Sequence, residues 1–174
     1  MDFADDGSLI AYGCGNSDTY IYSFSSNQYT LKQILKVSYN KDGGKVIFSE
    51  DSHRLFTLKS MQEVYVFHQG ANLFVLSQTI PVNLQGRTTF AMPRNARYFS
   101  TVERSEDDVY VALYGYSKEK LAYVKLHTES INYLVTEMFM NDRFIILVVG
   151  SSVSGCSTLA YKISQDGLTF SLEQ

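Results

Sequence analysis

The stretch Tyr29-Thr30-Leu31-Lys32-Gln33 decides the fold, because its pattern returns twice along the chain. Phe74-Val75-Leu76-Ser77-Gln78 lies 45 residues later, and Phe170-Ser171-Leu172-Glu173-Gln174 follows after a further 96 residues, or two periods of 48. The shared pattern is aromatic-x-Leu-x-Gln. A pattern that returns at a fixed period of roughly 40 to 50 residues is typical of a repeat architecture.

Two further marks carry the same period. Val64-Tyr65-Val66 recurs as Val109-Tyr110-Val111, again at 45 residues, and Tyr20-Ile21-Tyr22 sits one period earlier. An aromatic residue followed by a polar turn and an apolar strand appears at Phe3 to Ile10 and again at Phe48 to Leu55. Three independent marks that share one spacing make coincidence a poor explanation.

Each period contains four short strand signals separated by turn residues. In the second repeat the strands are expected over 45–48, 55–58, 64–68 and 73–78. Four short strands in about 40 to 45 residues form the blade of a β-propeller, and blades must stack around an axis because one blade cannot bury both its faces. The sequence therefore predicts an all-β fold of propeller blades, each with four antiparallel strands. The repeats are expected at approximately 1–35, 36–82, 83–127 and 128–174.

One segment links these blades to a known family. Phe3-Ala4-Asp5-Asp6-Gly7-Ser8-Leu9-Ile10-Ala11-Tyr12-Gly13 resembles the Phe-Ser-x-Asp-Gly-x-x-Leu-Ala-x-Gly passage of WD repeats. Asp18 to Phe24 resembles the third strand of that family, with Phe24 where the family places its Trp, although the chain contains no Trp-Asp dipeptide and no Gly-His pair. The resemblance covers the whole chain and is strongest in the first two repeats. It implies that the loops joining strands two and three share one face with the loops joining successive blades.

Four repeats raise the question of whether the chain forms a whole propeller ring. Most WD-like rings have seven or eight blades, so a fragment or half-ring, completed by another chain or by missing sequence, is the favoured architecture. The alternatives are a closed four-bladed ring and a different β-sandwich or barrel. An open array would leave two apolar faces in water, and we therefore expect the isolated chain to aggregate or to join other sequence. These faces are predicted on the first blade at 9–12 and 20–24 and on the fourth at 144–149 and 159–163.

In two stretches, Lys118 to Leu126 and Ser130 to Met140, the spacing of apolar residues is also compatible with a helix. We predict strands there only because the repeat places strands at these positions.

Composition excludes several classes of protein. The net charge is −3, and no cluster of Lys and Arg exceeds two neighbours, so we expect no nucleic-acid partner. The longest apolar run, Phe144 to Val149, is six residues, far short of the roughly 18 that a membrane helix needs. The acidic start after Met1, the lack of Asn-x-Ser/Thr and the two cysteines favour an intracellular, cytoplasmic location over secretion. Cys14 and Cys156 fall in equivalent loops of different blades and are predicted to be free thiols.

Motifs that suggest chemistry have simpler interpretations. Gly150 to Ser157 follows an apolar strand as a phosphate-binding loop does, but Cys156 stands where the lysine belongs and Thr158 to Ile163 is expected to be a strand, so we predict no nucleotide binding. Asp2, Asp6 and Gly7 fit a calcium loop only in part, and a turn with Gly7 in a strained backbone conformation is the better interpretation.

No convergent catalytic or metal set is visible either. His53, His68 and His127 fall in different repeats, none near a cysteine at metal-ligand spacing, and no Gly-x-Ser-x-Gly occurs. We therefore expect no catalytic residues, no metal and no cofactor.

The third repeat carries the densest charge. The run Glu103 to Asp108 is predicted to lie in the loop before the strand Val109 to Val111, most simply as a solvated hairpin tip. Together with arginines of the same repeat it gives this blade a mixed-charge rim. The candidate partner-contact residues are Arg87, Arg94, Arg97, Arg104, Glu106, Asp107 and Asp108.

The sequence thus favours a non-catalytic platform for protein–protein interaction, a WD-repeat-like scaffold with protein partners of unknown identity, and not an enzyme. The alternative is a propeller enzyme or a ligand-binding propeller of the ectodomain type, with its site at the central channel.

Overall fold

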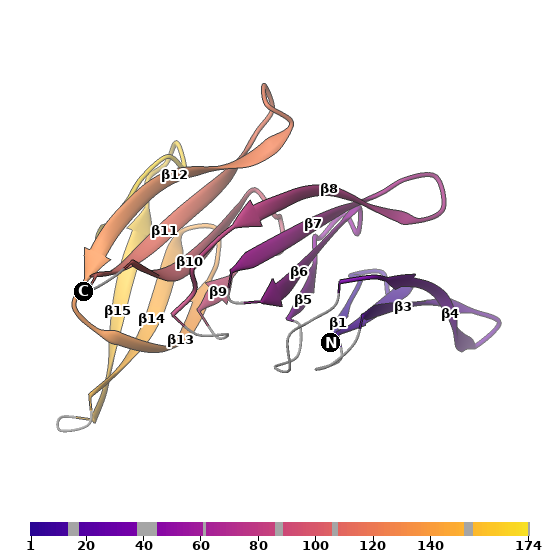
Figure 1. Cartoon of the computed structure of the whole chain (residues 1–174), viewed down its shortest axis with the longest axis horizontal. Coiled ribbons are helices and arrows are strands. Elements are labelled where there is room, and N and C mark those ends of the chain that lie inside the picture. The colour runs from indigo at the N-terminus through magenta and orange to yellow at the C-terminus, as the bar shows by residue number, and fades with distance from the viewer. Residues whose placement is uncertain are drawn as a thin grey trace. The chain divides into compact units, whose positions relative to one another are not determined.

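The computed structural model describes residues 1–13, 18–37, 45–60, 62–85, 89–105, 108–151 and 155–173. Sixteen strands form four antiparallel sheets of four strands, and these ranges contain no helix (Figure 1). The all-β prediction is confirmed. The two stretches that tolerate helical spacing are strands as well, with residues 118–121 forming a turn.

The chain divides into two compact units, Met1–Pro81 and Val82–Gln174. In the first unit one sheet contains β1 (Asp2–Phe3), β2 (Leu9–Gly13), β3 (Thr19–Ser25) and β4 (Gln28–Leu35). The other sheet of that unit contains β5 (Val46–Phe48), β6 (Arg54–Ser60), β7 (Glu63–Gln69) and β8 (Phe74–Pro81).

In the second unit one sheet contains β9 (Phe90–Ala91), β10 (Tyr98–Ser105), β11 (Asp108–Ser117) and β12 (Ala122–Ile131). The other contains β13 (Leu134–Met140), β14 (Phe144–Ser151), β15 (Gly155–Ile163) and β16 (Phe170–Leu172). Every sheet has its strands in sequence order, as a propeller blade does.

Each unit has its own apolar core between its two sheets. In the first unit Leu9 and Ile21 from one sheet pack with Leu55 and Phe67 from the other. In the second unit the core brings together residues of both sheets, among them Val102, Leu113, Leu147 and Tyr161. Alternate residues of a strand point to opposite faces of its sheet, so each central strand turns one set of side chains into this core.

A six-residue turn recurs at four hairpins. The third residue is Asp or Asn, whose side-chain oxygen accepts the N–H of the fifth residue, as Asp6 does from Ser8 at 2.9 Å. The fourth residue has a positive φ, which is 70° at Gly7, and this confirms the strained conformation predicted there. The turns span 4–9, 49–54, 93–98 and 164–169.

The aromatic-x-Leu-x-Gln segments lie in β4, β8 and β16, each the last strand of its sheet, so the prediction that they are equivalent is confirmed. A β-bulge fixes the register, because in β4 and β8 the last strand carries one extra residue opposite two consecutive residues of the third strand. Gln33 and Gln78 pair with the residue before the bulge, and Leu31 and Leu76 pair with the residue after it. Gln174 lies outside the described residues.

The same bulge identifies the missing copy of the motif in the third sheet. His127 pairs before the bulge between Leu113 and Tyr114, and Lys125 pairs after it. The third repeat therefore carries Tyr123-x-Lys125-x-His127 in place of aromatic-x-Leu-x-Gln. On this register Val64-Tyr65-Val66 aligns with residues 111–113 and not with 109–111, so the spacing mark read from the sequence is displaced by two residues.

Candidate functional site

A polar hollow of about 390 Å³ lies in the second unit, where the end of β10, the start of β11 and the end of β12 meet the start of β13. It combines four polar side chains with an apolar floor. The lining residues are Gln85, Arg104, Val109, Ile131, Asn132, Tyr133 and Leu134.

Backbone hydrogen bonds build one wall of this hollow. The segment before β9 runs beside the end of β10, where the Arg104 N–H donates to the Asn83 carbonyl at 2.7 Å and the Gln85 N–H donates to the Val102 carbonyl at 3.0 Å. The Asn83 side-chain amide also donates to the Arg104 carbonyl. Gln85 Oε1 then accepts the N–H of Val135 at 3.1 Å, which ties this wall to β13.

The chemistry of the hollow follows from its polar side chains. Arg104 is exposed, and its guanidinium makes no ion pair with any residue that the structure describes. A free guanidinium binds carboxylate or phosphate through paired N–H donors. Asn132 and Tyr133 are exposed in the connection between β12 and β13 and carry groups that hydrogen-bond to hydroxyls. The hollow therefore suits a small anion that also carries hydroxyl groups.

The opposite face of β10 carries a buried charge. Glu103 is only 3 % exposed, and its Oε1 accepts hydrogen bonds from the hydroxyls of Thr101 and Tyr114, both at 2.7 Å. Its Oε2 accepts from the Tyr110 hydroxyl at 3.1 Å and from Lys125 Nζ at 3.1 Å. The Lys125 ammonium also stands 5.2 Å from the ring centroids of both tyrosines.

This network is structural in character. Burial raises the pKa of the Tyr114 hydroxyl far above its ordinary value, and the hydrogen bond to Glu103 raises it further. Burial, followed by the charge of Glu103, also raises the pKa of Tyr110. Both tyrosines therefore stay protonated as donors, and each carboxylate oxygen already accepts two hydrogen bonds, so Glu103 is committed to the fold and not offered to a ligand.

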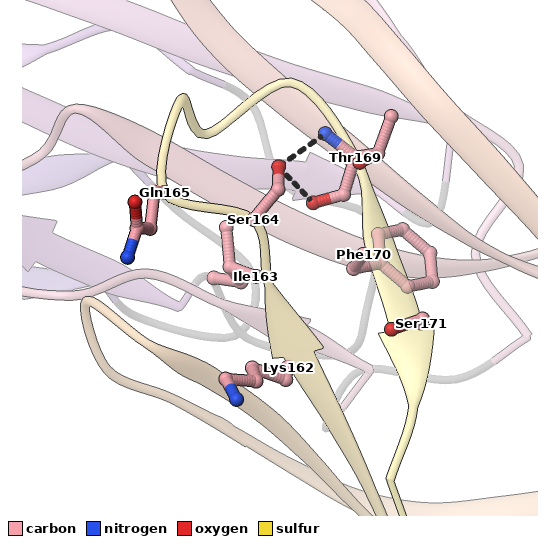
Figure 2. A pocket seen from close by; sticks show the side chains of 7 residues that line it. All are labelled: Lys162, Ile163, Ser164, Gln165, Thr169, Phe170 and Ser171. Carbon is pink, nitrogen blue, oxygen red and sulfur yellow. Dashed lines mark hydrogen bonds between the residues drawn. The ribbon is translucent and has the colours of Figure 1, made fainter.

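A second, smaller hollow of about 120 Å³ lies at the hairpin between β15 and β16 (Figure 2). Its polar centre is the Ser164 hydroxyl, which accepts the Thr169 N–H at 3.0 Å and lies 2.9 Å from the Thr169 carbonyl. The same hydroxyl lies 2.6 Å from Asp166 Oδ1. These are the internal bonds of the recurrent six-residue turn, so this hollow offers a ligand little that is not already used.

The predicted contact residues are spread along β10. Arg94 and Arg97 lie in the turn before it, whereas Arg104 lies near its far end, about 20 Å away along the strand at roughly 3.3 Å per residue. Asp108 opens β11 and pairs with Ser105. Arg87, Glu106 and Asp107 lie outside the described residues.

One part of that prediction is wrong. The run that begins at Glu103 is not all loop, because β10 continues through Ser105. The physical reason is the pleat, which turns Glu103 inward to Lys125 and Arg104 outward to the hollow.

The structure also bears on the predictions for the Gly-rich run, the cysteines, metal binding and membrane spans. Thr158 to Ile163 is a strand, as predicted, but this strand, β15, begins earlier, at Gly155, within the run that was predicted to be a loop. Cys156 is an exposed free thiol, and Cys14 lies outside the described residues. Within the described ranges no group of His, Cys, Asp and Glu is placed to hold a metal, and no helix is suited to cross a membrane.

Comparison with known proteins establishes the fold. No protein-family model matches the chain, and no curated protein matches its sequence. Among solved structures, the chain is similar to a protein of Bacteroides uniformis provisionally assigned as a 6-phosphogluconolactonase, with TM-score 0.74, 11% identity, and coverage of 99% of this chain and 52% of that one. It is also similar to the periplasmic gluconolactonase of Pseudomonas aeruginosa, with TM-score 0.71, 13% identity and coverage of 99% and 52%.

A third similar structure is the β-propeller domain of Cps50 (Swd1) from Myceliophteria thermophila, with TM-score 0.62, 10% identity and coverage of 94% and 53%. The chain therefore has a β-propeller fold and spans about half the length of the propellers it matches.

These similarities correct the functional prediction. The provisionally assigned 6-phosphogluconolactonase and the gluconolactonase both have higher TM-scores than the Swd1 domain, and both names are those of enzymes. The prediction of a non-catalytic interaction platform, and with it the prediction that the chain is not an enzyme, is contradicted. The alternative, a propeller enzyme or ligand-binding propeller, fits better. Sequence reasoning favoured the interaction platform because no local motif in the chain pointed to a chemistry.

Proposed function

We propose that the chain is part of a propeller enzyme that hydrolyses a sugar lactone, with the hollow at Arg104 as its substrate-binding region. The observation that carries this proposal is the similarity of all but 1% of the chain to two lactonase propellers. The hollow supports it independently, because a guanidinium with no ion pair to any described residue, together with amide and phenol groups, matches a hydroxylated, anionic substrate.

Lactone hydrolysis needs only the attack of water on the ring ester and the transfer of protons. Water attacks the carbonyl carbon of the ring ester, the bond from that carbon to the ring oxygen breaks, and the released alkoxide takes up a proton to give the hydroxy acid. Binding groups that fix the ring and neutralise negative charge accelerate such a step by orientation and electrostatic stabilisation. Arg104 is assigned the anionic or oxyanionic end of the substrate, and Asn132 and Tyr133 its hydroxyls.

The test uses acid release from 6-phosphogluconolactone and from gluconolactone, followed against the spontaneous rate. We expect acceleration, and we expect Arg104→Gln to lower kcat/KM about tenfold or more because one charge-assisted contact is lost. Arg97→Gln is the matched control, since that arginine is also exposed and lies in the turn that precedes β10. No rate above background with either lactone would refute the proposal. An equal loss in both variants would refute the assignment of the hollow.

Two finer attributes are also proposed. Descent of these blades from WD repeats is supported by the segment Phe3 to Gly13 and by the similarity to the Swd1 domain. An intracellular location is supported by the exposed free thiol of Cys156, and cell fractionation with an antibody against the chain would test it.

A further inference from the structure

Gln85 lines the hollow beside Arg104 and is held in place by both its backbone and its side chain. Its backbone N–H donates to the Val102 carbonyl at 3.0 Å, which fixes the main chain beside the end of β10. Its side-chain Oε1 accepts the N–H of Val135 at 3.1 Å. Val135 is the residue before the bulge in β13, so the Gln85 amide joins the segment before β9 to the other sheet of the same unit.

The hydrogen bond to Val135 decides which way the Gln85 amide is turned. A backbone N–H can only donate, so the atom that meets it must be the amide oxygen, and Nε2 lies on the other branch of the amide. Nε2 carries two N–H groups, and neither has an acceptor among the residues that the structure describes. Because Gln85 is half-buried in the wall of the hollow, it provides a neutral donor whose orientation is set before a ligand arrives.

Arg104 is a donor of a different kind. Its side chain is exposed, and no ion pair or hydrogen bond to a described residue holds its guanidinium in one position. Such a charge attracts an anion and supports binding. Stabilisation of a transition state, by contrast, is greatest when a donor is already aimed at the atom where charge develops. Gln85 meets that condition, because its amide is fixed by Val135.

We propose that Gln85 Nε2 donates to the carbonyl oxygen of the lactone and stabilises the oxyanion that forms there, while Arg104 binds the anionic group of a phosphorylated substrate. This inference rests on the proposed function and assigns its catalytic step to one residue. As water attacks, one water proton passes to the solvent and negative charge gathers on the former carbonyl oxygen. The carbonyl re-forms when the bond to the ring oxygen breaks, and the ring oxygen takes a proton from the solvent. The Gln85 amide keeps both of its own protons throughout.

Two substitutions separate the donor from the structural bond. In Gln85→Glu a carboxylate oxygen still accepts the Val135 N–H, but a second oxygen replaces the Nε2 donor. Gln85→Met keeps the approximate length of the side chain and loses both the donor and the acceptor. With neutral gluconolactone as the substrate, both variants should lower kcat about a hundredfold, as expected when one oxyanion donor is removed, and should leave KM within about threefold. Urea titration checks that Gln85→Glu unfolds at the wild-type midpoint.

Two further variants serve as references. Gln28→Glu is the matched control, because it makes the same chemical change at an exposed position of β4 in the other unit, and it should alter neither kcat nor KM. Arg104→Gln should give the opposite pattern. With 6-phosphogluconolactone it should raise KM about tenfold or more and leave kcat within about threefold, because it removes a charge that binds the phosphate.

The outcomes distinguish this inference from the proposed function. A wild-type rate no higher than the spontaneous rate with either lactone would overturn both. A wild-type rate above background, with kcat near wild type in Gln85→Glu and lowered only in Gln85→Met, would show that Gln85 serves only to tie the wall of the hollow to β13. That result would overturn the inference and leave the proposed function standing. So would a loss confined to KM in both variants.

Discussion

The two units differ in the side-chain contacts that join their two sheets. In the first unit Gln33 clamps the Phe74 backbone, and the Asp2 carboxylate accepts the Phe48 N–H at 2.8 Å. In the second unit His127 takes the place of the glutamine and packs edge-on against the Phe170 ring, with centroids 4.8 Å apart. The same position thus joins neighbouring sheets through hydrogen bonds in one unit and through an aromatic contact in the other.

The two units also differ in the side chains that surround the leucine position of the motif. In the second unit Lys125 replaces the leucine of the motif, and its charge is met by buried Glu103. Thr101 donates into that carboxylate. Thr57, at the equivalent position of the first unit when the sheets are aligned on their bulges, is 0% exposed and its hydroxyl has no partner among the described residues. A repeat position therefore tolerates a charge when its neighbours change with it.

The largest expected effect comes from breaking the charged pair of the second unit. Lys125→Leu restores the motif but leaves Glu103 buried without its cation, and it should lower the free energy of unfolding by about 3 kcal/mol. Adding Glu103→Leu should return stability to within about 1 kcal/mol of wild type, because an apolar pair of similar size replaces the ions. Urea titration followed by circular dichroism measures both. Lys162→Leu, which breaks the exposed pair with Glu173, is the control and should change less than about 0.5 kcal/mol.

A smaller loss is expected from the clamp of the first unit. Gln33→Leu removes two hydrogen bonds and leaves the Phe74 N–H and carbonyl without that partner, which should cost about 2 kcal/mol in the same titration. Gln28→Leu, in an exposed position of the same strand, should be nearly neutral. Conversely, His127→Gln should install a clamp in the second unit and leave stability within about 1 kcal/mol of wild type. A loss as large as that of Gln33→Leu would show that the two fastenings are not interchangeable.

The smallest effects should have opposite signs. Thr57→Val removes a buried hydroxyl that lacks a partner and should stabilise the protein by about 1 kcal/mol. Thr101→Val removes a donor to Glu103 and should destabilise it by about 1 to 2 kcal/mol. Shifts of the same sign in the thermal midpoint of the two variants would contradict the comparison.

Local sequence patterns predicted the blades, but they did not reveal the copy of the motif in the third repeat. Aromatic-x-Leu-x-Gln marks three last strands, and in β4 and β8 its leucine and glutamine pair on the two sides of the bulge. Tyr123-x-Lys125-x-His127 escaped because its leucine and glutamine are both replaced, and the compensating residue, Glu103, lies 22 residues away in β10. No local signal pointed to Glu103, because Lys125 is itself 37% exposed and the leucines that it replaces, Leu31 and Leu76, are exposed too.

The candidate site was predicted only in part. Arg104 was singled out for its charge, but Gln85, Asn132 and Tyr133 join it through the pairing of distant segments, which no spacing in the sequence reveals. The acidic run was interpreted as solvated because charge density alone does not show which residues the pleat turns inward. A period-two reading from Val102 to Ser105 would have separated Glu103 from Arg104.

The recurrent six-residue turn has a consequence for how the chain acquires its structure. Each turn is closed by bonds among its own residues, namely the Asx contact and a backbone bond from the fourth residue to the first. Three of the turns also have a backbone bond between their ends, as in Ala4 to Leu9 at 3.0 Å. Such a loop needs no distant partner, and hairpins of this kind form in about 1 to 10 μs. Because three of these turns join the first two strands of a sheet and one joins the last two of the fourth, every sheet has its own starting point. We expect each sheet to begin folding independently. The packing of the formed sheets against one another is then expected to limit the folding rate.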